Sequence, residues 1–336
     1  MKNYDVVLKI REKVREVVLE NKLINDDETV VVGVSGGPDS MCLLDILYYL
    51  QKNENMNFHI VVAHVNHMIR PESYDEKEYV ERVCKSLDIP FYYKEVDVKS
   101  IAMHEHISEE TCGRNIRYEF FNEISKKSKN SKIAVAHNLN DDVETIILNL
   151  IRGCGLNGLT GIKYTNNNII RPLLDIEKKD ILEYNTKRNI YSCFDVTNTM
   201  DIYTRNKVRL NLLPVLKNEY NPNIMESIIR MKHILELDNE FLEEYVQKVA
   251  NDSIIEITDD KIIFDFSTLV CEHESIKRRF IIKIIGLKIG SIDGIGNIHI
   301  KDILKLLDSG ITGKMYIFGK KFRIKILKKH IAMIYW

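Results

Sequence analysis

The sequence predicts an α/β protein with a parallel-sheet domain at the amino end, a helical domain after it and a small α+β unit at the carboxyl end. Residues 30–37 pass from a β-branched run into a glycine pair, and strand-like and helix-like segments then alternate as far as residue 145. Residues 224–250 carry apolar positions at helical spacing. Strands separated by helices imply right-handed crossovers, so we expect the sheet to be mainly parallel.

The first strand-to-helix junction has the features of a phosphate-binding loop. Val30–Val34 suits a buried parallel strand, and Gly36 and Gly37 permit a tight turn with exposed amides. Pro38 fits an early helical position, where no amide donor is needed. The amides and hydroxyls of Ser35–Ser40 and the positive end of the following helix favour a bound anion. No lysine follows Gly37, so the Walker pattern is absent and a γ-phosphate transfer enzyme is disfavoured. An ordinary glycine-rich turn is the alternative.

The other elements of the sheet domain follow in order. We expect helices over residues 40–50, 73–87 and 108–125, and strands over residues 58–65, 91–96 and 132–137. In parallel sheets, ligands sit beyond the carboxyl ends of the strands. The segments 35–40, 64–70 and 137–144 each follow a strand, so the sequence predicts that the site lies at this edge.

The predicted domain boundary lies just after Pro214, before the breaker at residues 221–223. We assign residues 1–217 to a nucleotide-binding catalytic domain and residues 218–336 to a helical domain with a small β-containing unit. In the second domain we expect a helix over 224–250, a strand over 262–266, helices over 275–287 and 299–307, and a hairpin that turns at Gly319-Lys320.

A basic stripe lies near the carboxyl end. Between residues 314 and 330 the cations are Lys314, Lys320, Lys321, Arg323, Lys325, Lys328 and Lys329, and the segment holds no acid. Such a stripe can bind a phosphate backbone even in a chain whose net charge is −1. A hairpin edge that lysines protect from further pairing is the alternative.

The composition indicates a cytoplasmic protein. With 45% hydrophobic and 29% charged residues, the sequence has no run of about 18 apolar residues that would span a membrane, and its first residues lack a signal-peptide core. The six cysteines form no Cys-x-x-Cys pair. Neither a disulfide framework nor a zinc or iron–sulfur site is therefore expected.

Acidic residues follow two of the predicted strands. A lone carboxylate in the loop, Asp39, would repel a triphosphate unless Mg²⁺ stood between them, and helix capping is its alternative role. Asp141 and Glu144 lie three residues apart, so they share one helical face and can point into one cleft beside His137. There they could hold Mg²⁺ or recognise an ammonium group, whereas the alternative is a favourable interaction with the helix dipole.

Two arginine pairs complement these acids. Arg114 and Arg117, and likewise Arg205 and Arg209, stand at helical spacing, which suits bidentate contacts with phosphates. Each pair by itself is also compatible with a surface ion-pair face. His64 is followed three residues later by a second histidine, but no third metal ligand lies close in sequence. A turn that lines a nucleotide pocket explains His64 as well as a metal site does.

Six segments in order resemble the tRNA(Ile)-lysidine synthetase family of the PP-loop, or ATP pyrophosphatase, superfamily. The resemblance covers about residues 28–216 and implies a PP-loop ATPase fold of the adenine nucleotide α-hydrolase type. In that family, ATP adenylates the C2 oxygen of the wobble cytidine in the CAU anticodon of tRNA(Ile), and the amine of free lysine then displaces AMP. The segments are Ser35–Ser40, His64–Arg70, His137–Thr145, Arg152–Gly161, Arg171–Leu174 and Arg205–Pro214.

The resemblance implies ATP and Mg²⁺ as cofactors, and tRNA(Ile) and free L-lysine as partners, with no membrane and with a homodimer left open. The expected ATP-binding residues are Ser35, Gly36, Gly37, Pro38, Asp39, Ser40 and His64, with Asp39 also facing Mg²⁺. The expected catalytic residues are Asp39, Arg114, His137, Asp141, Glu144 and Arg205. The expected lysine-binding or tRNA-binding residues are Asp141, Glu144, Arg117, Arg209, Lys320, Lys321 and Arg323. Spacing does not decide which carboxylate binds metal and which binds lysine.

Two alternatives stay open at this point. A tRNA 2-thiolating PP-loop enzyme would need paired cysteines or a cluster to carry sulfur, whereas Cys112 and Cys154 are single and well separated. A non-catalytic nucleotide or tRNA binder would not need the intact loop together with Asp39 and the acidic helix start. Larger family members carry an additional carboxy-terminal domain. The acceptor-stem contacts expected from such a domain are either missing here or supplied by the basic stripe.

Overall fold

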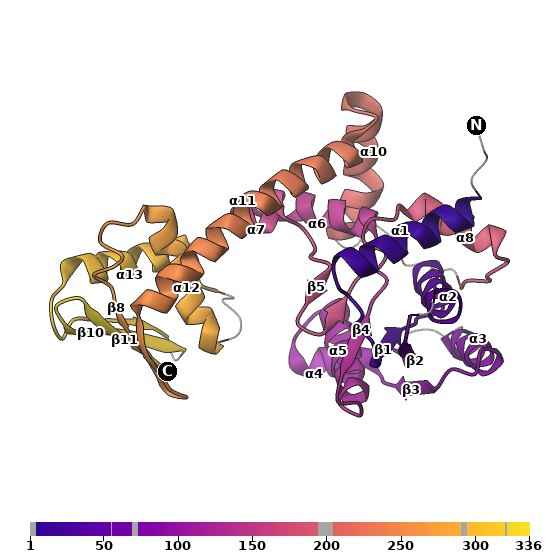
Figure 1. Ribbon diagram of the computed structural model, residues 1–336, viewed down its shortest axis with the longest axis horizontal. Coiled ribbons are helices and arrows are strands. Elements are labelled where there is room, and N and C mark those ends of the chain that lie inside the picture. Colours follow the sequence, from indigo (N-terminus) through magenta and orange to yellow (C-terminus); the bar gives the residue numbers. More distant parts are fainter. Residues whose placement is uncertain (1–4, 55, 69–72, 194–203, 290–293, 320) are drawn as a thin grey trace. The chain divides into compact units, whose positions relative to one another are not determined.

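The computed structural model describes residues 5–54, 56–68, 73–193, 204–289, 294–319 and 321–336. The chain divides into two compact units, Met1–Lys232 and His233–Trp336, and Figure 1 labels their elements. The division falls beyond residue 217, where the sequence suggests a boundary, and that boundary stays a prediction. None of the helices in the described part of the chain has the length and apolar character needed to cross a bilayer.

A six-stranded sheet forms the centre of the first unit. Its strand order is β3-β2-β1-β4-β6-β5, and every neighbouring pair is parallel except β5 with β6. This confirms the predicted α/β class with a mainly parallel sheet. The strands are β1 (Glu28–Gly33), β2 (Phe58–Asn66), β3 (Phe91–Glu95), β4 (Ser131–Ala134), β5 (Thr165–Asn166) and β6 (Ile169–Ile170).

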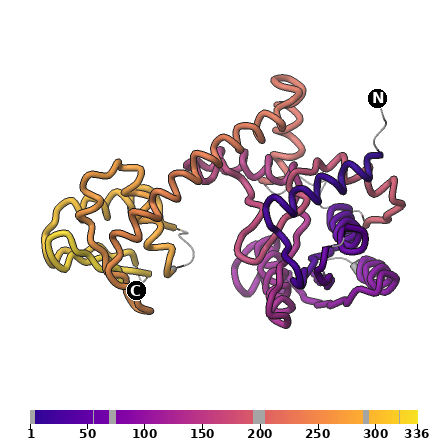
Figure 2. Tube along the Cα trace, in the orientation of Figure 1, coloured from indigo at the N-terminus to yellow at the C-terminus, as the bar shows by residue number. Residues whose placement is uncertain are grey.

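Helices cover both faces of this sheet, and the path of the chain between them can be followed in Figure 2. Because strand side chains alternate, Val30 and Val32 of β1 pack on one side with α1, α2, α3 and α8, while Val31 packs on the other side with α5. The helices of the sheet region are α1 (Val6–Glu20), α2 (Pro38–Asn53), α3 (Ser73–Ser86), α4 (Val98–Glu105), α5 (Glu109–Ser125), α6 (Leu139–Arg152), α7 (Leu156–Leu159) and α8 (Lys178–Lys187).

The glycine that ends β1 is required by this packing. A Cβ atom on Gly33 would lie 2.6 Å from the ring of Phe121, because α5 approaches the sheet directly above it. The close approach fixes the height of the following phosphate loop relative to α5.

The order of the strands places the site. Strands β1, β2 and β3 run outward in one direction, and the chain then returns to add β4 on the other side of β1. Such a reversal between β1 and β4 opens a crevice beyond their carboxyl ends, which is where open α/β sheets bind ligands. Ser35–Ser40 follows β1 and His137–Glu144 follows β4, so the two motifs border the same crevice.

The segment after residue 203 winds in an irregular helix. It comprises α9 (Thr204–Lys207), the π-helical turn η2 (Val208–Leu212), α10 (Leu213–Val215) and a second π-helical turn, η3 (Leu216–Tyr220). Pro214 has no amide hydrogen and its ring collides with the carbonyl of an ordinary α-helical turn, so the wider π turn accommodates it. Val208 and Leu213 pack with Val143 and Ile147 of α6, which places this segment against the carboxyl edge of the site.

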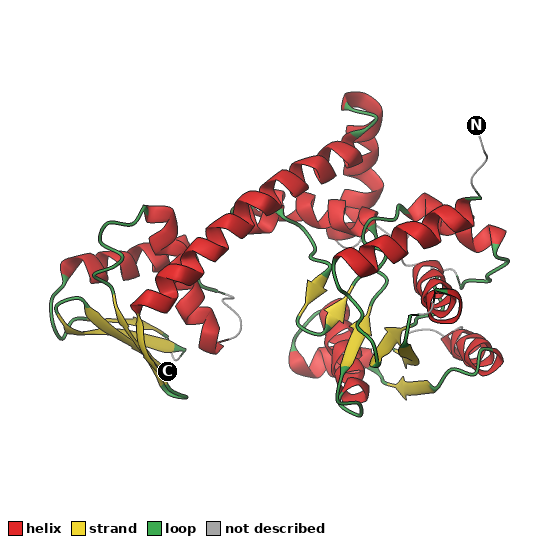
Figure 3. Ribbon diagram, viewed as in Figure 1, coloured by secondary structure: helices red, strands yellow, loops and turns green. Residues whose placement is uncertain are grey.

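The second unit consists of a five-stranded sheet and helices packed against it, as Figure 3 shows. The sheet order is β7-β8-β11-β10-β9, with all pairs antiparallel. In β10, Phe322, Ile324 and Ile326 are buried among helix side chains, whereas Arg323 is exposed. The elements are α11 (Ile224–Ser253), which begins in the first unit, then β7 (Ile254–Ile257), β8 (Lys261–Asp265), α12 (Glu274–Ile289), α13 (Asn297–Ser309), β9 (Met315–Phe318), β10 (Phe322–Lys328) and β11 (Ile331–Tyr335).

The expected hairpin near residue 319 is present as β9 and β10. Because β10 lies between β11 and β9, it is not an edge strand. The alternative interpretation of Arg323 and Lys325 as cations that guard an edge is therefore wrong. Helices α1, α4 and α8 are findings that the sequence analysis did not predict.

A buried ion pair joins α11 to α6 within the first unit. Lys232 Nζ lies 2.6 Å from Asp142 Oδ2, and the two side chains are 2% and 1% exposed. Lys232 also donates to the carbonyl of Ile162, whose amide donates to Asp142 Oδ1 at 2.6 Å. Gly161 is required beside this pair, since its φ is +62° and a Cβ there would lie 2.2 Å from Asp142 Oδ1.

We expect Lys232→Met to lower the free energy of unfolding by about 3–5 kcal/mol, because it leaves the Asp142 carboxylate buried without its cation. Urea unfolding followed by circular dichroism measures the change. Lys248→Met, which alters an exposed lysine on the same helix, is the matched control and should change stability by less than about 0.5 kcal/mol. A Lys232→Met protein as stable as this control would contradict the role of the pair.

Candidate active site

The phosphate loop has a fixed internal geometry. Ser40 Oγ accepts the amide of Ser35 at 3.1 Å and donates to the carbonyl of Gly37 at 3.0 Å. Gly36 has a φ of +86°, and its left-handed conformation turns the chain between β1 and α2. Gly37 caps α2 without a side-chain hydrogen bond, and Pro38 occupies the first turn. The amides at the start of α2 therefore remain available to an anion, as the sequence predicts.

His64 supports the loop from the neighbouring strand. Its side chain is 2% exposed, Nδ1 lies 2.8 Å from the carbonyl oxygen of Val34, and the ring stacks on Tyr93 at a centroid distance of 5.9 Å. Because Val34 presents a carbonyl, Nδ1 carries the proton and Nε2 is the free acceptor. Burial lowers the pKa of His64, so the ring is neutral near pH 7. This histidine orients the backbone that enters the loop.

Asp39 is paired with a lysine that the sequence analysis missed. Lys178 Nζ lies 2.7 Å from Asp39 Oδ1 and 2.6 Å from Oδ2. Burial raises the pKa of Asp39, and Lys178 opposes that shift. No local pattern indicates this contact, because Lys178 starts α8 and lies 139 residues further along the chain.

Four charged residues that the sequence analysis treated as two separate sets form one cluster. Glu144, 1% exposed, accepts Arg209 Nε on Oε1 at 2.6 Å and Arg205 Nε on Oε2 at 2.9 Å. Asp141 Oδ1 contacts Arg205 Nη2 at 3.2 Å and Arg209 Nη2 at 3.1 Å. Each guanidinium thus bridges both carboxylates, and the cluster fastens residues 204–212 to α6.

Asp141 has a second structural role. It forms a capping box with Asn138 at the start of α6, in which each side chain accepts the other residue's amide. A lysine ammonium would have to join this occupied cluster or displace a guanidinium. The assignment of Asp141 and Glu144 to lysine binding therefore stays a prediction.

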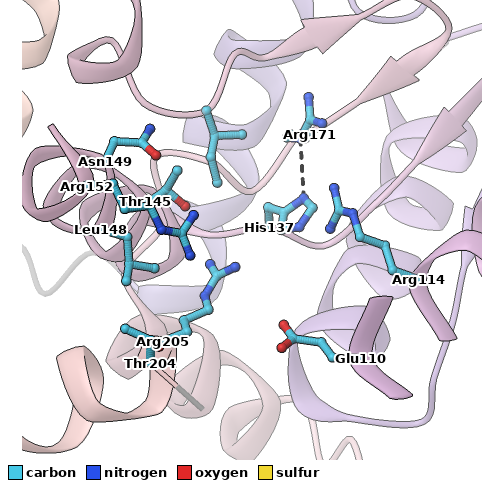
Figure 4. Close-up of a pocket in the computed structure, with 11 residues that line it drawn as sticks. Glu110, Arg114, His137, Thr145, Leu148, Asn149, Arg152, Arg171, Thr204 and Arg205 are labelled. Atoms are coloured by element: carbon cyan, nitrogen blue, oxygen red, sulfur yellow. Dashed lines mark hydrogen bonds between the residues drawn. The ribbon is translucent and has the colours of Figure 1, made fainter. Parts of the chain in front are cut away.

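A cationic cavity of about 420 Å³ adjoins the cluster. Figure 4 shows side chains from α5, from α6 and from the chain around residues 171 and 205 facing the space beside His137. Four arginines and one carboxylate supply its charge, so it suits an anionic group. The charged lining residues are Arg114, Arg152, Arg171, Arg205 and Glu110.

His137 is held neutral in this cavity. Arg171 Nε donates to its Nδ1 at 3.3 Å, which assigns the ring proton to Nε2. Burial lowers the pKa of His137 to about 4, together with the charges of Arg171, Arg114 and Arg205, and these effects outweigh that of Asp141. The ring can therefore donate a hydrogen bond from Nε2 to an anion without carrying charge.

The oxygen ligands at the loop fit Mg²⁺ that arrives with a nucleotide. Within the described residues, no group of three or more His, Cys, Asp or Glu side chains is arranged to hold a metal ion. Mg²⁺ commonly binds through one or two carboxylates together with substrate phosphates, so the lack of a complete protein cage is no obstacle. Asp39 is the carboxylate of the loop, and Asp141 is close enough to influence its pKa.

The structure brings most of the predicted site residues together in the first unit. Ser35–Ser40, His64, Arg114, His137, Asp141, Glu144, Arg205 and Arg209 border the switch-point crevice or its cationic cavity. Arg117 lies on α5 with Nε 3.4 Å from the carbonyl of Gly113, and burial lowers its pKa. Lys321 and Arg323 belong to the second unit, and Lys320 lies outside the described residues.

Sequence comparison agrees with this geometry. Residues 7–216 match a protein-family profile described as a PP-loop domain. A tRNA(Ile)-lysidine synthase of Caldanaerobacter subterraneus subsp. tengcongensis is 40% identical over 96% of this chain and 68% of its own length. One from Clostridioides difficile is 38% identical over 96% of this chain and 71% of its own length. The chain belongs to the tRNA(Ile)-lysidine synthase family. The resemblance stated from the motifs is thereby confirmed.

A solved structure supports the PP-loop fold of this family member. The U34-tRNA thiolase NcsA from Methanococcus maripaludis, described with its [4Fe-4S] cluster, superimposes with a TM-score of 0.56 at 21% identity. The match covers 69% of this chain and 80% of that one. At this identity the likeness shows the fold alone. The six cysteines here are all free thiols, three of them buried.

We expect His137 to make stability depend on pH. Its pKa is about 4 in the folded chain and about 6.5 in an unfolded one. Between these values the unfolded state binds a proton that the folded state does not, so the free energy of unfolding falls as the pH is lowered from 6.5 to 4. His137→Gln should fall less steeply over this window in urea unfolding. His67, whose pKa is likewise lowered to about 4, is present in both proteins and cancels in the comparison. Equal slopes would exclude the effect.

Proposed function

We propose that this chain converts the wobble cytidine of tRNA(Ile) with a CAU anticodon to lysidine, using ATP and free L-lysine and releasing AMP and pyrophosphate. The carrying observation is that the phosphate loop and the acid–arginine cluster border one crevice at the β1–β4 switch point. Asp39 of the loop and Asp141 of the cluster influence each other's charge. Asp39 likewise raises the pKa of Arg209. Phosphate binding and amine chemistry therefore share one site.

The first proposed step is adenylation of the base. The C2 oxygen of cytosine attacks the α-phosphorus of ATP, the bond between the α- and β-phosphates breaks, and pyrophosphate leaves with the bridging oxygen. The amides of Ser35–Ser40 and the start of α2 hold the departing phosphates. Magnesium, held by Asp39 and the phosphates, would supply charge neutralisation there. Adenylation matters because the C2 oxygen could otherwise leave only as oxide or hydroxide.

The second proposed step forms the carbon–nitrogen bond. The ε-amine of lysine attacks C2 after losing a proton, and AMP leaves with the former C2 oxygen. Asp141 is the more accessible carboxylate, with a side chain 16% exposed against 1% for Glu144. We therefore assign the ammonium contact to Asp141, while Glu144 positions the two arginines.

The cationic cavity is assigned to the anionic group that must be stabilised in both steps. Arg114 and Arg205 reach it from different elements, and neutral His137 adds a donor. An AMP phosphate or a phosphate of the anticodon loop matches this lining. These substrates are cytoplasmic, so the proposal retains the cytoplasmic location. A homodimer remains an untested prediction.

The direct test incubates the protein with ATP, Mg²⁺, tritiated lysine and unmodified tRNA(Ile) bearing CAU. We expect label to enter the tRNA with equal amounts of AMP and pyrophosphate released. Asp39→Ala should abolish pyrophosphate release and remain folded, since Asp39 is partly exposed and its loop keeps its own hydrogen bonds. Asp26→Ala, at an exposed aspartate before β1, is the matched control.

Other outcomes decide against the proposal. Release of ADP in place of AMP would exclude adenylation. Incorporation of sulfur instead of lysine would favour the thiolation alternative. Full activity of Asp39→Ala would remove this carboxylate from the mechanism.

We also propose that the basic hairpin contacts tRNA. Arg323 stands on the open face of the sheet between Ile317 and Tyr335 of the adjacent strands, and Lys325 stands between Met315 and Met333. The buried positions of β10 alternate with these cations, so the cations share the face away from the core. Cations on a sheet face can contact a phosphate backbone.

Replacing Lys320, Lys321 and Arg323 by alanine should weaken tRNA binding and flatten its dependence on salt. Each lost phosphate contact reduces the slope of log K against log salt by about 0.7–0.9. Filter binding at several salt concentrations measures this. Substitution of Lys126, Lys127 and Lys129, which lie at the opposite, amino-terminal end of β4, is the control and should leave the slope unchanged. An unchanged slope in the hairpin variant would remove it from the tRNA interface.

A further inference from the structure

The pair between Lys178 and Asp39 is placed where a nucleotide's phosphates would lie. The ammonium contacts both carboxylate oxygens at 2.6–2.7 Å, and the side chains are 34% and 29% exposed. Asp39 is in the first turn of α2, beside the open amides of the phosphate loop. The pair is therefore accessible from the crevice rather than sealed in the core.

Lys178 is held in position by its own helix. Its amide donates to Asn140 Oδ1 at 2.9 Å, which ties the start of α8 to the start of α6. Asn185 Nδ2 donates to the carbonyl of Pro38 at 2.9 Å, so α8 is also fastened to the first turn of α2. Arg188 contacts Asp45 Oδ1 further along the same two helices at 3.0 Å. An exposed ion pair between two flexible side chains would not need such support.

The loop requires a cation that its own sequence does not contain. A Walker loop brings its lysine within the loop, whereas no lysine follows Gly37 here. Asp39 adds a negative charge at the position where the phosphates must bind. In the structure, the cation in direct contact with Asp39 is Lys178, which is supplied from a second element.

We propose that Lys178 is a phosphate-binding residue that exchanges partners, pairing with Asp39 in the free protein and with the β- and γ-phosphates in the nucleotide-bound protein. In that state Asp39 faces magnesium instead. As the bond between the α- and β-phosphates breaks, the bridging oxygen gains negative charge and the Lys178 ammonium donates hydrogen bonds to the departing pyrophosphate. The ammonium keeps its proton throughout. The inference rests on the proposed function, because it presupposes that pyrophosphate is the leaving group.

A structural role is the competing explanation, since Lys178 also helps to join α8 to α2. The two explanations differ in which ligand loses affinity. A phosphate-binding lysine matters for inorganic pyrophosphate, and much less for AMP, which has no β- or γ-phosphate. A purely structural lysine would affect both ligands together, along with the melting temperature.

The experiment measures binding of inorganic pyrophosphate and of AMP by isothermal titration calorimetry at fixed Mg²⁺, and binding of Mg²⁺ alone in separate titrations. We expect Lys178→Met to weaken pyrophosphate binding about tenfold to a hundredfold, as expected for loss of a charged hydrogen bond. AMP binding should change less than about threefold. Binding of Mg²⁺ alone should be unchanged or tighter, because its competitor on Asp39 has been removed.

Two further variants sharpen the test. Lys179→Met changes the neighbouring lysine, which is 71% exposed and pairs with Glu177 at 2.9 Å, and should leave all three affinities unchanged. Lys178→Arg keeps the charge and should retain part of the pyrophosphate affinity. Pyrophosphate affinity that is equal in Lys178→Met and wild type would overturn the inference. Parallel losses for pyrophosphate, AMP and Mg²⁺ would also overturn it, in favour of the structural role.

The design separates this inference from the proposed function. If the wild-type protein binds pyrophosphate but forms no lysidine, the proposed function fails while the role of Lys178 at the loop is still decided by its variants. If the wild-type protein binds no pyrophosphate, both are wrong.

Discussion

The buried carboxylate of Glu144 is the constraint on which the site depends. A carboxylate that is 1% exposed must be paired, and here Arg205 and Arg209 pair with it from a segment more than sixty residues away. This requirement holds residues 204–212 against α6 and brings two guanidinium groups to the edge of the switch-point crevice. The π-helical turn at Val208–Leu212 carries Arg209, so the irregular winding around Pro214 also contributes to where that cation lies.

Charge at the crevice is distributed between two sides. On one side the phosphate loop, Asp39 and Lys178 form a nearly neutral group that can reorganise around a polyanion. On the other side the cavity beside His137 is strongly cationic, and that cationic environment keeps the histidine neutral. One side thus suits a leaving pyrophosphate and the other suits a nucleotide phosphate that stays. Such a division is consistent with a reaction that cleaves ATP between its α- and β-phosphates.

Structural and chemical roles coincide in several residues. Asp141 caps α6 and also bridges two arginines. Asp142, its neighbour, points away from the crevice into the buried pair with Lys232, which anchors α11. Three acids within four positions therefore serve three different contacts. The sequence shows them only as an acidic helix start, because charge type and spacing do not reveal the partner of each carboxylate.

The sequence by itself determined the fold class, the phosphate loop and the crevice edge, because these depend on local signals. Strand and helix periodicity, the Gly36-Gly37 turn and the position of motifs after strands are all encoded within short segments. Only the tertiary structure decided which charges meet. Lys178 reaches Asp39, Arg205 reaches Glu144 and Lys232 reaches Asp142 across 139, 61 and 90 residues. Contacts at such separations are fixed by how the helices pack on the sheet, which no local pattern records.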